Sequence, residues 1–337
     1  MDIKILSKRD IESVLNISEV ISAVENVYSQ KTKGAAESWP TLFYDFKTGK
    51  ADMDIKSGYI RGIEIFGSKT VSWFGENEGK NLPTLNGVIT VFDATTGLPL
   101  GVLEGAYITG MRTGAAGAIG AKCLARPDSE NLMLLGAGNQ AVFQIAATLT
   151  LLPQIKRVRI VDVMSFDNAK EFADNITGRL SSQFGIDASS VFFEASELKE
   201  AVSASDIIIT VTPSHEPVIH KEWVRPGTHF SCIGADMAGK EEIDAEIFRN
   251  ARIFADDIKH CIEVGEMEIP FKKGIITESH IAGEIGDILS GKAQGRTSED
   301  QITIYDATGM AMLDLATAKL ALDSAGKRNM GVSAPLY

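Results

Sequence analysis

Two glycines and one aspartate have the residue types and the spacing of a dinucleotide-binding turn. Gly136 and Gly138 follow an apolar run and open an amphipathic segment, which predicts a sharp turn from a strand into a helix. Gly138 lets backbone N–H groups approach a pyrophosphate, which then lies at the partly positive N-terminus of that helix. Asp162 ends the next predicted strand, residues 158–163, and can accept hydrogen bonds from a ribose 2′-hydroxyl. The pattern favours NAD over NADP, because a 2′-phosphate would meet a like charge.

A second part of the cofactor site is predicted where a later apolar run, residues 206–211, stops at a loop. In doubly wound sheets, ligands lie beyond the carboxyl ends of the strands, at the point where the strand order reverses. This loop should therefore line the nicotinamide side of the cofactor. Together with the glycine turn, the predicted cofactor contacts include Asn139, Gln140, Thr210, Val211 and Thr212.

Asp236 follows the next predicted strand, residues 228–235, at the same edge of the sheet. We interpret it as the acid beside the reacting carbon. The alternative is that Asp236 is the N-cap of a helix predicted at residues 241–250, and its position leaves both interpretations open.

Arg112 stands near the start of a segment rich in glycine and alanine, residues 107–124, that is predicted to be a helix. The small residues allow another backbone to approach closely, so the helix should pass under the cofactor or under another helix. A cation at a helix N-terminus works against the helix dipole unless an anion is bound nearby. Beside a cofactor fold, we favour substrate binding by Arg112 over an ordinary surface ion pair.

The composition restricts the possible partners. The chain has 337 residues, enough for two domains, with 44% hydrophobic and 23% charged residues. A formal net charge of −12 argues against nucleic acid and anionic membranes as partners, so an anionic substrate must be met by a few local cations. The three cysteines include no C-x-x-C pair, which favours a cytoplasmic protein without disulfides. The five histidines lack metal-ligand spacing, and no metal site, membrane span or signal peptide is expected.

The periodicity predicts an α/β protein in which a mainly antiparallel sheet precedes a nucleotide-binding fold. A first helix is predicted at residues 7–30, with Ser7 as its cap and Asp10 at the third helical position. Antiparallel strands are predicted at residues 41–45, 51–59, 63–74, 87–93 and 100–104. Later strands are predicted at residues 158–163, 190–195, 206–211, 228–235 and 252–256, with helices at 167–184 and 196–204. The segment 302–324 is predicted to be a strand and a helix that return to the first domain.

Six motifs, in their order along the chain, resemble the ornithine cyclodeaminase and mu-crystallin family, which also contains archaeal-type alanine dehydrogenases and imino-acid reductases. They are E-G-A-Y-I-T-G-M-R-T-G-A-A from position 104, G-A-G-N-Q from 136, T-P-S from 212, I-G-A-D-M-A-G-K from 233, G-E-I-G-D from 283 and I-T-I-Y-D-A-T-G from 302. The resemblance covers nearly the whole chain and is far more specific than the glycine turn alone.

The resemblance implies a homodimer and a Rossmann NAD-binding domain inserted in an α+β domain for dimerisation and substrate binding. We place the domain boundaries at 1–125 plus 308–337 for the substrate domain and at 126–307 for the Rossmann domain. The resemblance also implies that Lys69 lies near the substrate, that Arg112 pairs with the substrate carboxylate and that Asp236 handles the proton of the amine or of water. Thr84 matches a threonine near the cofactor phosphates and nicotinamide.

These residue types suit hydride transfer from the Cα atom of an amino acid. A protonated α-amine cannot release hydride, so a base such as Asp236 must first remove its proton. A bidentate arginine fixes the carboxylate and thereby the face of Cα that meets nicotinamide C4. Lys69 can share the carboxylate or assist proton transfer. The alternative for Lys69 is a solvated strand lysine, which the apolar residues after it disfavour.

The sequence departs from the family pattern before this lysine. Family members usually carry an arginine or lysine in the first strand, whereas this chain has Thr41 there and Lys56 in place of the usual M-P turn. We hypothesise that Lys56 supplies the missing charge to the carboxylate or selects a second carboxylate on the substrate. Asp306 resembles the cyclodeaminase and alanine dehydrogenase branches, because a lysine is common in the mu-crystallin branch.

Two classes of function follow. The first is an NAD-dependent enzyme acting on a small L-amino or imino acid. Addition of water to the iminium product gives an oxo acid and ammonia, whereas addition of a side-chain amine gives cyclodeamination, as of ornithine to proline, with the cofactor recycled. The second class is a non-catalytic protein that binds NAD(P)H, as in mu-crystallin. The joint presence of Lys69, Arg112 and Asp236 favours the enzyme.

Overall fold

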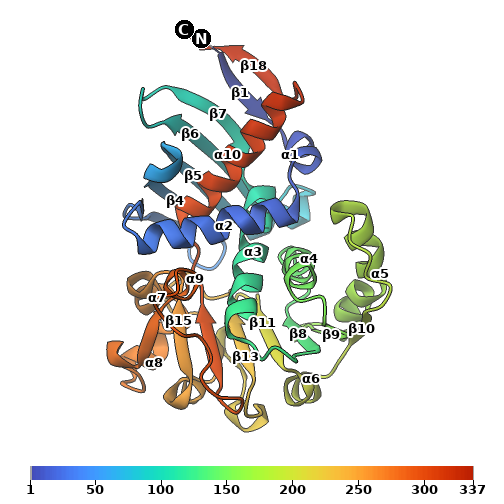
Figure 1. Ribbon diagram of the computed structural model, residues 1–337. Helices are drawn as coiled ribbons and strands as arrows, with labels where there is room; N and C mark the ends of the chain where they lie inside the picture. Colours follow the sequence, from blue (N-terminus) through green and yellow to red (C-terminus); the bar gives the residue numbers. More distant parts are fainter. Residues whose placement is uncertain (1, 337) are drawn as a thin grey trace. The chain divides into compact units, whose positions relative to one another are not determined.

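The computed structural model describes residues 2–336 (Figure 1). The chain forms two compact units, one comprising Met1–Arg112 with Met310–Tyr337 (unit 1) and the other comprising Thr113–Gly309 (unit 2). The division at 112/113 falls inside one long helix, α3 (Ala106–Leu124), whereas the predicted boundary at 125/126 follows the end of that helix. The predicted boundaries therefore stay a prediction about which segments fold together.

Unit 1 contains a mostly antiparallel sheet, as predicted. Its strand order is β18-β1-β7-β6-β5-β4-β2, with β3 paired to β4, and among residues 2–336 of this sheet only β1 and β7 pair in parallel. The bounds are β1 (Asp2–Leu6), β2 (Ala36–Ser38), β3 (Leu42–Lys47), β4 (Ala51–Ile60), β5 (Ile65–Phe74), β6 (Leu85–Asp93), β7 (Pro99–Glu104) and β18 (Val332–Pro335). Strand β3 is exposed along its whole length.

The predicted first helix is two helices, α1 (Lys8–Val14) and α2 (Ile17–Thr32). The capping box of Ser7 and Asp10 is confirmed. The prediction of one continuous helix is wrong because Leu15 is extended and the side chain of Asn16 accepts a hydrogen bond from Ser18 N at 2.8 Å, which starts a second helix.

Helix α10 (Ala311–Lys327) is the central helix of unit 1. It packs against α2 and against strands β4, β5 and β6 (Figure 1). Most of its residues are buried, and one of them is the carboxylate Asp314, which is 0% exposed. A charged side chain at such a position requires partners, because an unpaired buried charge costs several kcal/mol or more.

Unit 2 is a parallel sheet of eight strands in the order β10-β9-β8-β11-β13-β17-β15-β16. The bounds are β8 (Asn131–Leu135), β9 (Arg157–Val161), β10 (Phe192–Ala195), β11 (Ile207–Thr210), β13 (His229–Cys232), β15 (Arg252–Ala255), β16 (Ile281–Glu284) and β17 (Thr303–Asp306). The chain runs outward from β8 to β10 and then returns to β11 on the other side of β8. The strand order therefore reverses between β8 and β11, as in a Rossmann fold.

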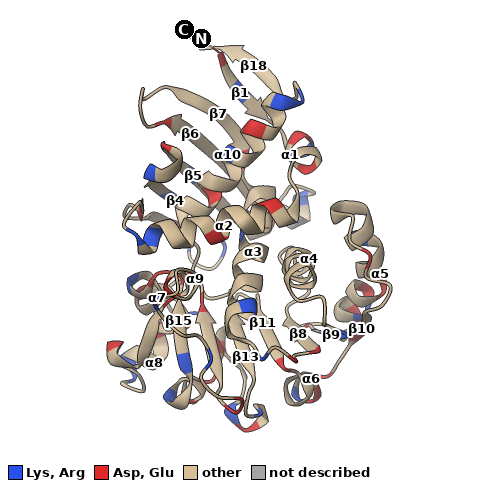
Figure 2. Ribbon diagram, in the orientation of Figure 1, with Lys and Arg blue, Asp and Glu red and all other residues tan. Residues whose placement is uncertain are grey.

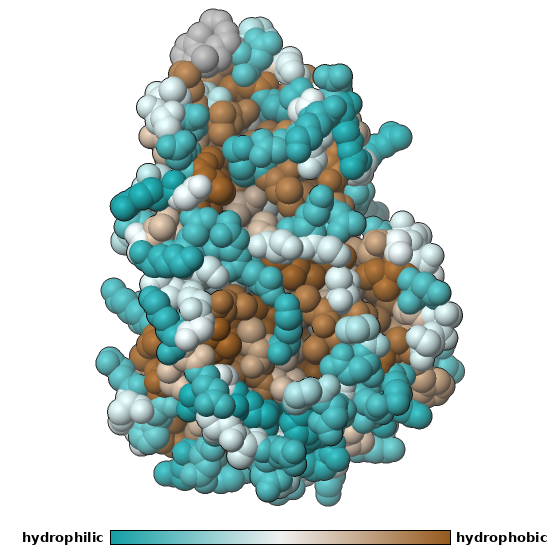
Figure 3. All heavy atoms as spheres, in the orientation of Figure 1, coloured by the Kyte–Doolittle hydropathy of each residue, from teal (hydrophilic) through white to brown (hydrophobic). Residues whose placement is uncertain are grey.

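The helices of unit 2 flank this sheet (Figure 1). They are α4 (Ala141–Leu151), α5 (Phe166–Phe184), α6 (Leu198–Ala204), α7 (Ile258–Val264), α8 (Glu268–Lys272) and α9 (Ile285–Leu289). Helix α5 buries one stripe at helical spacing, as its sequence requires, and ends at Gly185 in the left-handed region. Helix α4 carries no charged residue (Figure 2). Hydrophobic side chains show between hydrophilic ones on the visible face of each unit (Figure 3).

The close approach predicted for the glycine-rich helix is confirmed within unit 2. A Cβ atom on Gly114 would lie 2.4 Å from the carbonyl oxygen of Phe143 in α4, and one on Gly120 would lie 2.1 Å from the ring of Tyr305 in β17. Because neither neighbour leaves room for a methyl group, both positions need glycine for the helix to pack.

The helix predicted at residues 241–250 is wrong. Residues Glu241–Ile243 form strand β14, which pairs with β12 (His215–Ile219), and Ala245–Asn250 form a short 3₁₀ helix. Asp244 caps that short helix by accepting a hydrogen bond from Glu246 N at 2.9 Å. Strand pairing with β12 decides the local structure here, and it removes the helix for which Asp236 was the alternative cap.

Candidate functional site

The glycine turn after β8 has the geometry that a dinucleotide requires. Gly136 has a φ of 108°, and a Cβ atom there would lie 3.1 Å from the carbonyl oxygen of Val211. Gly138 faces open space, with nothing within 4 Å of a Cβ atom built on it. The first glycine is therefore required by the turn itself, and the second leaves its backbone accessible to a ligand.

Helix α4 begins directly after this turn, and no side chain of its N-cap residue caps the N–H groups of its first turn. The side chain of its N-cap residue, Gln140, makes no capping hydrogen bond, and its buried Oε1 atom has no partner among residues 2–336. The exposed Asn139 lies between this cap and Gly138. First-turn N–H groups that no side chain caps form a site for a phosphate, with the helix dipole favouring the negative charge.

Asp162 follows the end of β9. Its Oδ1 atom accepts hydrogen bonds from Met164 N at 2.9 Å and Ser165 N at 3.3 Å. No described residue donates to its Oδ2 atom. The local turn thus holds the carboxylate in place through one oxygen and leaves the other for a hydroxyl donor, which fits a ribose.

A buried glutamate that the sequence analysis missed ties β11 to β13 at the same edge. Glu242 accepts hydrogen bonds from Thr210 Oγ1 at 2.6 Å and Gly234 N at 3.0 Å through Oε2. Its Oε1 atom accepts from Thr212 N at 2.6 Å and Thr212 Oγ1 at 2.7 Å. All four partners are donors, so the side chain suits this position as an ionised carboxylate.

Glu266 lies beside this carboxylate and accepts hydrogen bonds from Glu242 N at 2.7 Å and Ile243 N at 2.8 Å. Burial, and then the neighbouring Glu242 charge, raise the pKa of Glu266 well above its usual range. Burial also raises the pKa of Glu242, against the opposing effect of its hydrogen bonds. Both pKa values are shifted in the same direction, because burial and the like charge of the neighbour disfavour two ionised carboxylates side by side.

The predicted cofactor residues of unit 2 are gathered by adjacent strands. The glycine turn follows β8, Asp162 follows β9, and Thr210 ends β11, so all of them lie at the carboxyl edge of the sheet on both sides of the strand-order reversal. Val211 and Thr212 continue from β11, and Val211 N donates to Leu135 O at 2.9 Å. Thr84 belongs to unit 1, where it precedes β6 and its carbonyl accepts from Phe74 N at 2.8 Å.

Asp236 lies in unit 2, after β13, and is half exposed. Its Oδ1 atom is 2.6 Å from Lys240 Nζ, which also donates to Gly234 O at 3.4 Å. The N-cap interpretation of Asp236 is wrong, because no helix begins there. Asp236 is in a different unit from Lys69 and Arg112, and its role as the base stays a prediction.

Unit 1 contains a buried charge cluster formed by Lys56, Lys69, Arg112 and Asp314, which we call the cation cluster. Asp314 Oδ2 is 3.0 Å from Lys69 Nζ, and Asp314 Oδ1 is 3.1 Å from Arg112 Nε. Lys56 pairs in register with Lys69 on strands β4 and β5. The exposed fractions of the three cations are between 2% and 7%, so all three charges are withdrawn from water.

Two features leave the cation cluster able to bind an anion. First, three buried cations face one fully buried carboxylate, with Asp54 half buried beside them. Second, Arg112 uses only Nε, since no acceptor for its Nη1 and Nη2 atoms lies among residues 2–336. A guanidinium with free terminal nitrogens matches a carboxylate in bidentate geometry.

The cluster also sets the proton affinity of Lys69. Burial lowers the pKa of Lys69 to about 8, with Arg112 and Lys56 adding to the effect and Asp314 opposing it. The pKa of Asp314 is lowered, because the charges of Arg112 and Lys69 outweigh the effect of burial. Lys69 therefore carries a proton at neutral pH and can release it in mildly alkaline solution.

Asp314 was missed in the sequence analysis, although a signal for it exists. It lies in the run M-A-M-L-D-L-A-T-A, where an acidic residue interrupts a helical pattern that is otherwise apolar or small. A lone carboxylate on the buried face of a helix indicates a buried cationic partner. The identity of that partner depends on which strand the helix crosses, which no local pattern contains.

Known proteins resemble this chain over nearly its whole length. The model of the ornithine cyclodeaminase/mu-crystallin family matches residues 1–329. The chain is 36% identical to the alanine dehydrogenase of Archaeoglobus fulgidus over 331 residues, which cover 98% of each chain. An archaeal alanine dehydrogenase dimer solved with bound NAD aligns over 100% of both chains with a TM-score of 0.92 and 33% identity. The Thermococcus litoralis Δ1-pyrroline-2-carboxylate reductase, solved with NADH and L-proline, aligns over 98% of this chain and 100% of that one with a TM-score of 0.91 and 31% identity.

Within residues 2–336, no helix has the length and apolar character needed to cross a membrane. In the same part of the chain, no three His, Cys, Asp or Glu side chains gather in a way that could hold a metal ion. Unit 1 thus contains the cation cluster, and unit 2 contains the dinucleotide edge.

Proposed function

Because the chain belongs to the ornithine cyclodeaminase/mu-crystallin family, we propose that it is an NAD-dependent oxidoreductase acting on a small L-amino or imino acid. The reaction moves a hydride between the Cα atom of the substrate and nicotinamide, with an imine intermediate. The observation that carries the proposal is the cation cluster, in which Arg112 keeps two terminal nitrogens for a carboxylate. The related alanine dehydrogenase and pyrroline-carboxylate reductase support the same class of substrate.

In this proposal each residue of the cation cluster has a task. Arg112 fixes the substrate carboxylate, which determines the face of Cα that reacts. Lys69 shares that carboxylate in its protonated form and, with a pKa of about 8, is suited to exchange a proton with the substrate nitrogen. Asp236 removes the proton of the α-amine, because a protonated amine holds its electron pair and prevents loss of hydride.

The cofactor is proposed to be NAD, with NADP a poorer ligand. When bound, NAD accepts or returns the hydride. Gly136 and Gly138 would hold its pyrophosphate, with Asn139 and Gln140 at the start of α4, and Asp162 would hold the adenine ribose through Oδ2. Support comes from the open backbone at Gly138, the uncapped start of α4 and the free carboxylate oxygen. Thr84, Thr210, Val211 and Thr212 are proposed as further contacts.

Lys56 is proposed to supply the carboxylate charge that other family members place in the first strand. Its burial and its register opposite Lys69 support this role. Among the charges that act on Lys69, two are cations and two are carboxylates, so with Lys69 itself the sum is +1 (three minus two), which one substrate carboxylate neutralises. We therefore favour a monocarboxylic acid over a dicarboxylic acid. An unchanged KM for every accepted acid in Lys56→Ala would remove Lys56 from the site.

The proposed function is tested by incubating the protein with NAD⁺ and a panel of L-amino acids at alkaline pH, while NADH absorbance and ammonia are measured in parallel. We expect both products, because water addition to the imine releases ammonia after the hydride has left. Ammonia without NADH would instead identify a cyclodeaminase. Tight NADH binding with neither product across the panel would identify a ligand-binding protein of the mu-crystallin kind.

We also propose that the protein is a cytoplasmic homodimer whose first domain, residues 1–125 and 308–337, carries the contact. Support comes from strand β3, where four large apolar side chains are about half exposed: Leu42, Phe43, Tyr44 and Phe46. Contiguous exposed apolar side chains of this size are typical of interaction surfaces. Light scattering should give twice the mass of the chain, and Tyr44→Glu should reduce the dimer population. A wild-type monomer at micromolar concentration would contradict the proposal.

A further inference from the structure

We propose that Asp314 is a positioning residue for substrate binding, which holds Arg112 and Lys69 so that both cations present their free donors to one carboxylate. The inference rests on the proposed function, and it adds a residue from helix α10 to the site. Asp314 acts through its two neighbours, so its effect should appear in carboxylate binding rather than in cofactor binding.

The geometry assigns each carboxylate oxygen to one cation. Oδ2 pairs with Lys69 Nζ at 3.0 Å, and Oδ1 accepts from Arg112 Nε at 3.1 Å. Arg112 lies in α3 and Lys69 lies in β5, so Asp314 connects two elements that are distant in sequence. The carboxylate is completely buried, and water does not compete for these contacts.

The use of Nε distinguishes this ion pair from one that occupies the guanidinium. An arginine bound through both terminal nitrogens has its bidentate edge filled, whereas Arg112 is held from the side by Nε alone. The side contact restricts rotation of the planar group, and Nη1 and Nη2 have no acceptor among residues 2–336. A substrate carboxylate then meets a guanidinium that is already oriented, which reduces the entropy lost on binding.

Thr109 adds a second restraint. Its Oγ1 atom donates to Asp314 Oδ1 at 3.4 Å and accepts from Lys69 Nζ at 3.4 Å. Asp314 is also in the first turn of α10, where the helix dipole favours a negative charge. Thr109 and the helix dipole therefore add to the two cations in holding the carboxylate in place.

Charge balance explains why a protein carboxylate is needed at this position. Lys69 faces Asp314 from α10, Arg112 from α3, and Lys56 and Asp54 from β4. Without Asp314, three buried cations would repel one another, and Lys69 would lose the stronger of the two carboxylates that act on its charge. The pKa of Lys69, already lowered to about 8 mainly by burial, would fall further because Asp314 is the stronger of the two carboxylates that oppose the fall. Lys69 would then lose the proton that attracts the substrate.

The experiment compares Asp314→Asn, Asp314→Glu and the wild type in the direction of imine reduction, with pyruvate, ammonium and NADH. In Asp314→Asn we expect the KM for pyruvate to rise about 30-fold or more, because a buried charge pair has lost one partner, while the KM for NADH changes less than about twofold. The inflection of kcat/KM for pyruvate near pH 8 should move to lower pH. Asp314→Glu, which keeps the charge, should recover part of the pyruvate affinity.

Asp323→Asn is the matched control, because Asp323 lies on the same helix in an exposed pair with Lys319 at 2.7 Å. Thermal unfolding of each variant separates loss of fold from loss of binding. Wild-type values for the pyruvate KM and for the pH profile in Asp314→Asn would overturn the inference and leave the proposed function standing. If Asp314→Asn does not fold, Asp314→Glu decides in the same way, and wild-type pyruvate KM and pH inflection in that variant would overturn the inference.

Quenching of the fluorescence of bound NADH by pyruvate measures pyruvate binding without requiring turnover. A wild-type protein that binds pyruvate without reducing it, and that oxidises no L-amino acid of the panel, would overturn the proposed function, and weaker pyruvate binding by Asp314→Asn would still support the inference. Equal pyruvate binding by the wild type and Asp314→Asn would overturn the inference alone. A wild-type protein that neither binds nor reduces pyruvate, and that neither binds nor oxidises any L-amino acid of the panel, would overturn both.

Discussion

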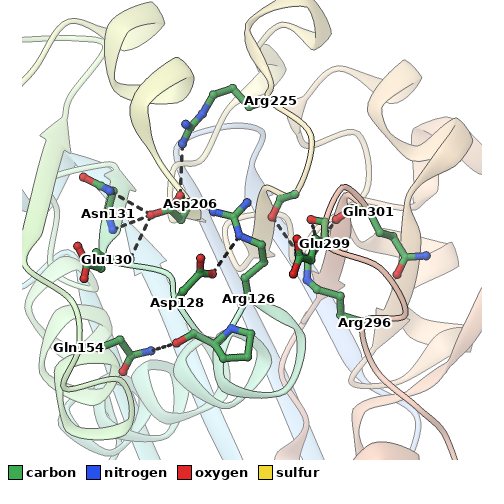
Figure 4. A network of polar contacts seen from close by, with 12 residues as sticks. Arg126, Asp128, Glu130, Asn131, Gln154, Asp206, Arg225, Arg296, Glu299 and Gln301 are labelled. Atoms are coloured by element: carbon green, nitrogen blue, oxygen red, sulfur yellow. Dashed lines mark hydrogen bonds and ion pairs between the residues drawn. The ribbon is translucent and has the colours of Figure 1, made fainter.

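Each unit contains a buried aspartate that binds at least one arginine, and the two sites differ in how many arginine donors lack an acceptor among residues 2–336. In unit 2, Asp206 accepts from Arg126 at 2.9 Å and Arg225 at 3.3 Å through Oδ1. Its Oδ2 atom accepts from Glu130 N, Asn131 N and Asn131 Nδ2. Figure 4 shows both arginines directed at this carboxylate. In unit 1, Arg112 meets Asp314 with Nε alone.

The neighbouring Arg296 also differs from Arg112, because protein acceptors bind its donors. It donates to the carbonyl oxygens of Leu124 at 2.9 Å and Gly227 at 3.0 Å, among others, and to Thr303 Oγ1 at 3.0 Å (Figure 4). Burial, together with the charge of Arg126, lowers the pKa of Arg296 to about 10. An arginine whose donors are all used by the protein closes loops and stabilises the fold. An arginine such as Arg112, whose two terminal nitrogens have no acceptor among residues 2–336, can instead bind the carboxylate of a ligand.

The strongest test of this comparison is Arg112→Lys, which keeps the charge and removes the bidentate edge. We expect kcat/KM for the amino acid to fall about 100-fold, because a lysine cannot orient a carboxylate through two parallel hydrogen bonds. Thermal stability should change little, since the lysine can still pair with Asp314. Steady-state kinetics and a thermal unfolding curve measure the two effects. An unchanged kcat/KM would show that the free terminal nitrogens have no function.

The converse test is Asp206→Asn in the saturated cluster. We expect the free energy of unfolding to fall by about 3 kcal/mol, because Arg126 and Arg225 lose a buried charged acceptor. The KM values of the folded protein should stay at wild-type levels. Urea denaturation followed by circular dichroism gives the first quantity. A large rise in KM with unchanged stability would reverse the roles assigned to the two clusters.

Glu242→Gln tests the buried carboxylate whose hydrogen bonds hold the loop after β11. In this cluster the carboxylate supports a loop and does not bind a ligand. Whichever way the new amide is turned, its NH₂ group faces a backbone N–H, that of Thr212 or that of Gly234. The loop after β11 should therefore shift, and we expect the KM for NADH to rise about tenfold, with a smaller effect on the amino acid KM. Glu242→Asp, which keeps the charge and shortens the reach, provides the comparison. Equal NADH affinity in all three proteins would exclude a role for Glu242 in cofactor binding.

The smallest expected effect is the pH dependence of carboxylate binding. The protonated form of Lys69 attracts the substrate carboxylate, so binding is strong below pH 8 and weakens as the pH rises through the pKa of about 8. We expect the KM for the acid to increase a few-fold between pH 7 and pH 9. Lys69→Arg stays charged over this range and should bind the acid with a KM that is nearly independent of pH, whatever its kcat. A wild-type KM that is flat from pH 7 to pH 9 would contradict the assignment.

Local sequence pattern predicted much of unit 2 and of the dinucleotide edge. The turn at Gly136 and the carboxylate at Asp162 are recognisable because a strand, a tight turn and a helix are consecutive in sequence. The helix predicted at residues 241–250 failed for the opposite reason, since β14 forms only because β12 lies beside it. The break of the first helix at Asn16 depends on one cap that competes with a continuous helical pattern.

The sequence alone determined which residues could carry charge into a buried place, because Lys69 and Arg112 stand among apolar or small residues that must lie inside. Only the tertiary structure decided that Asp314, more than 200 residues from Arg112, faces both cations, and that Glu242 supports Thr210 and Thr212. The physical reason is the separation in sequence between the residues that are in contact. Turns and caps follow from contacts a few residues apart, whereas a buried ion pair depends on helix α10 crossing strand β5 in one particular register.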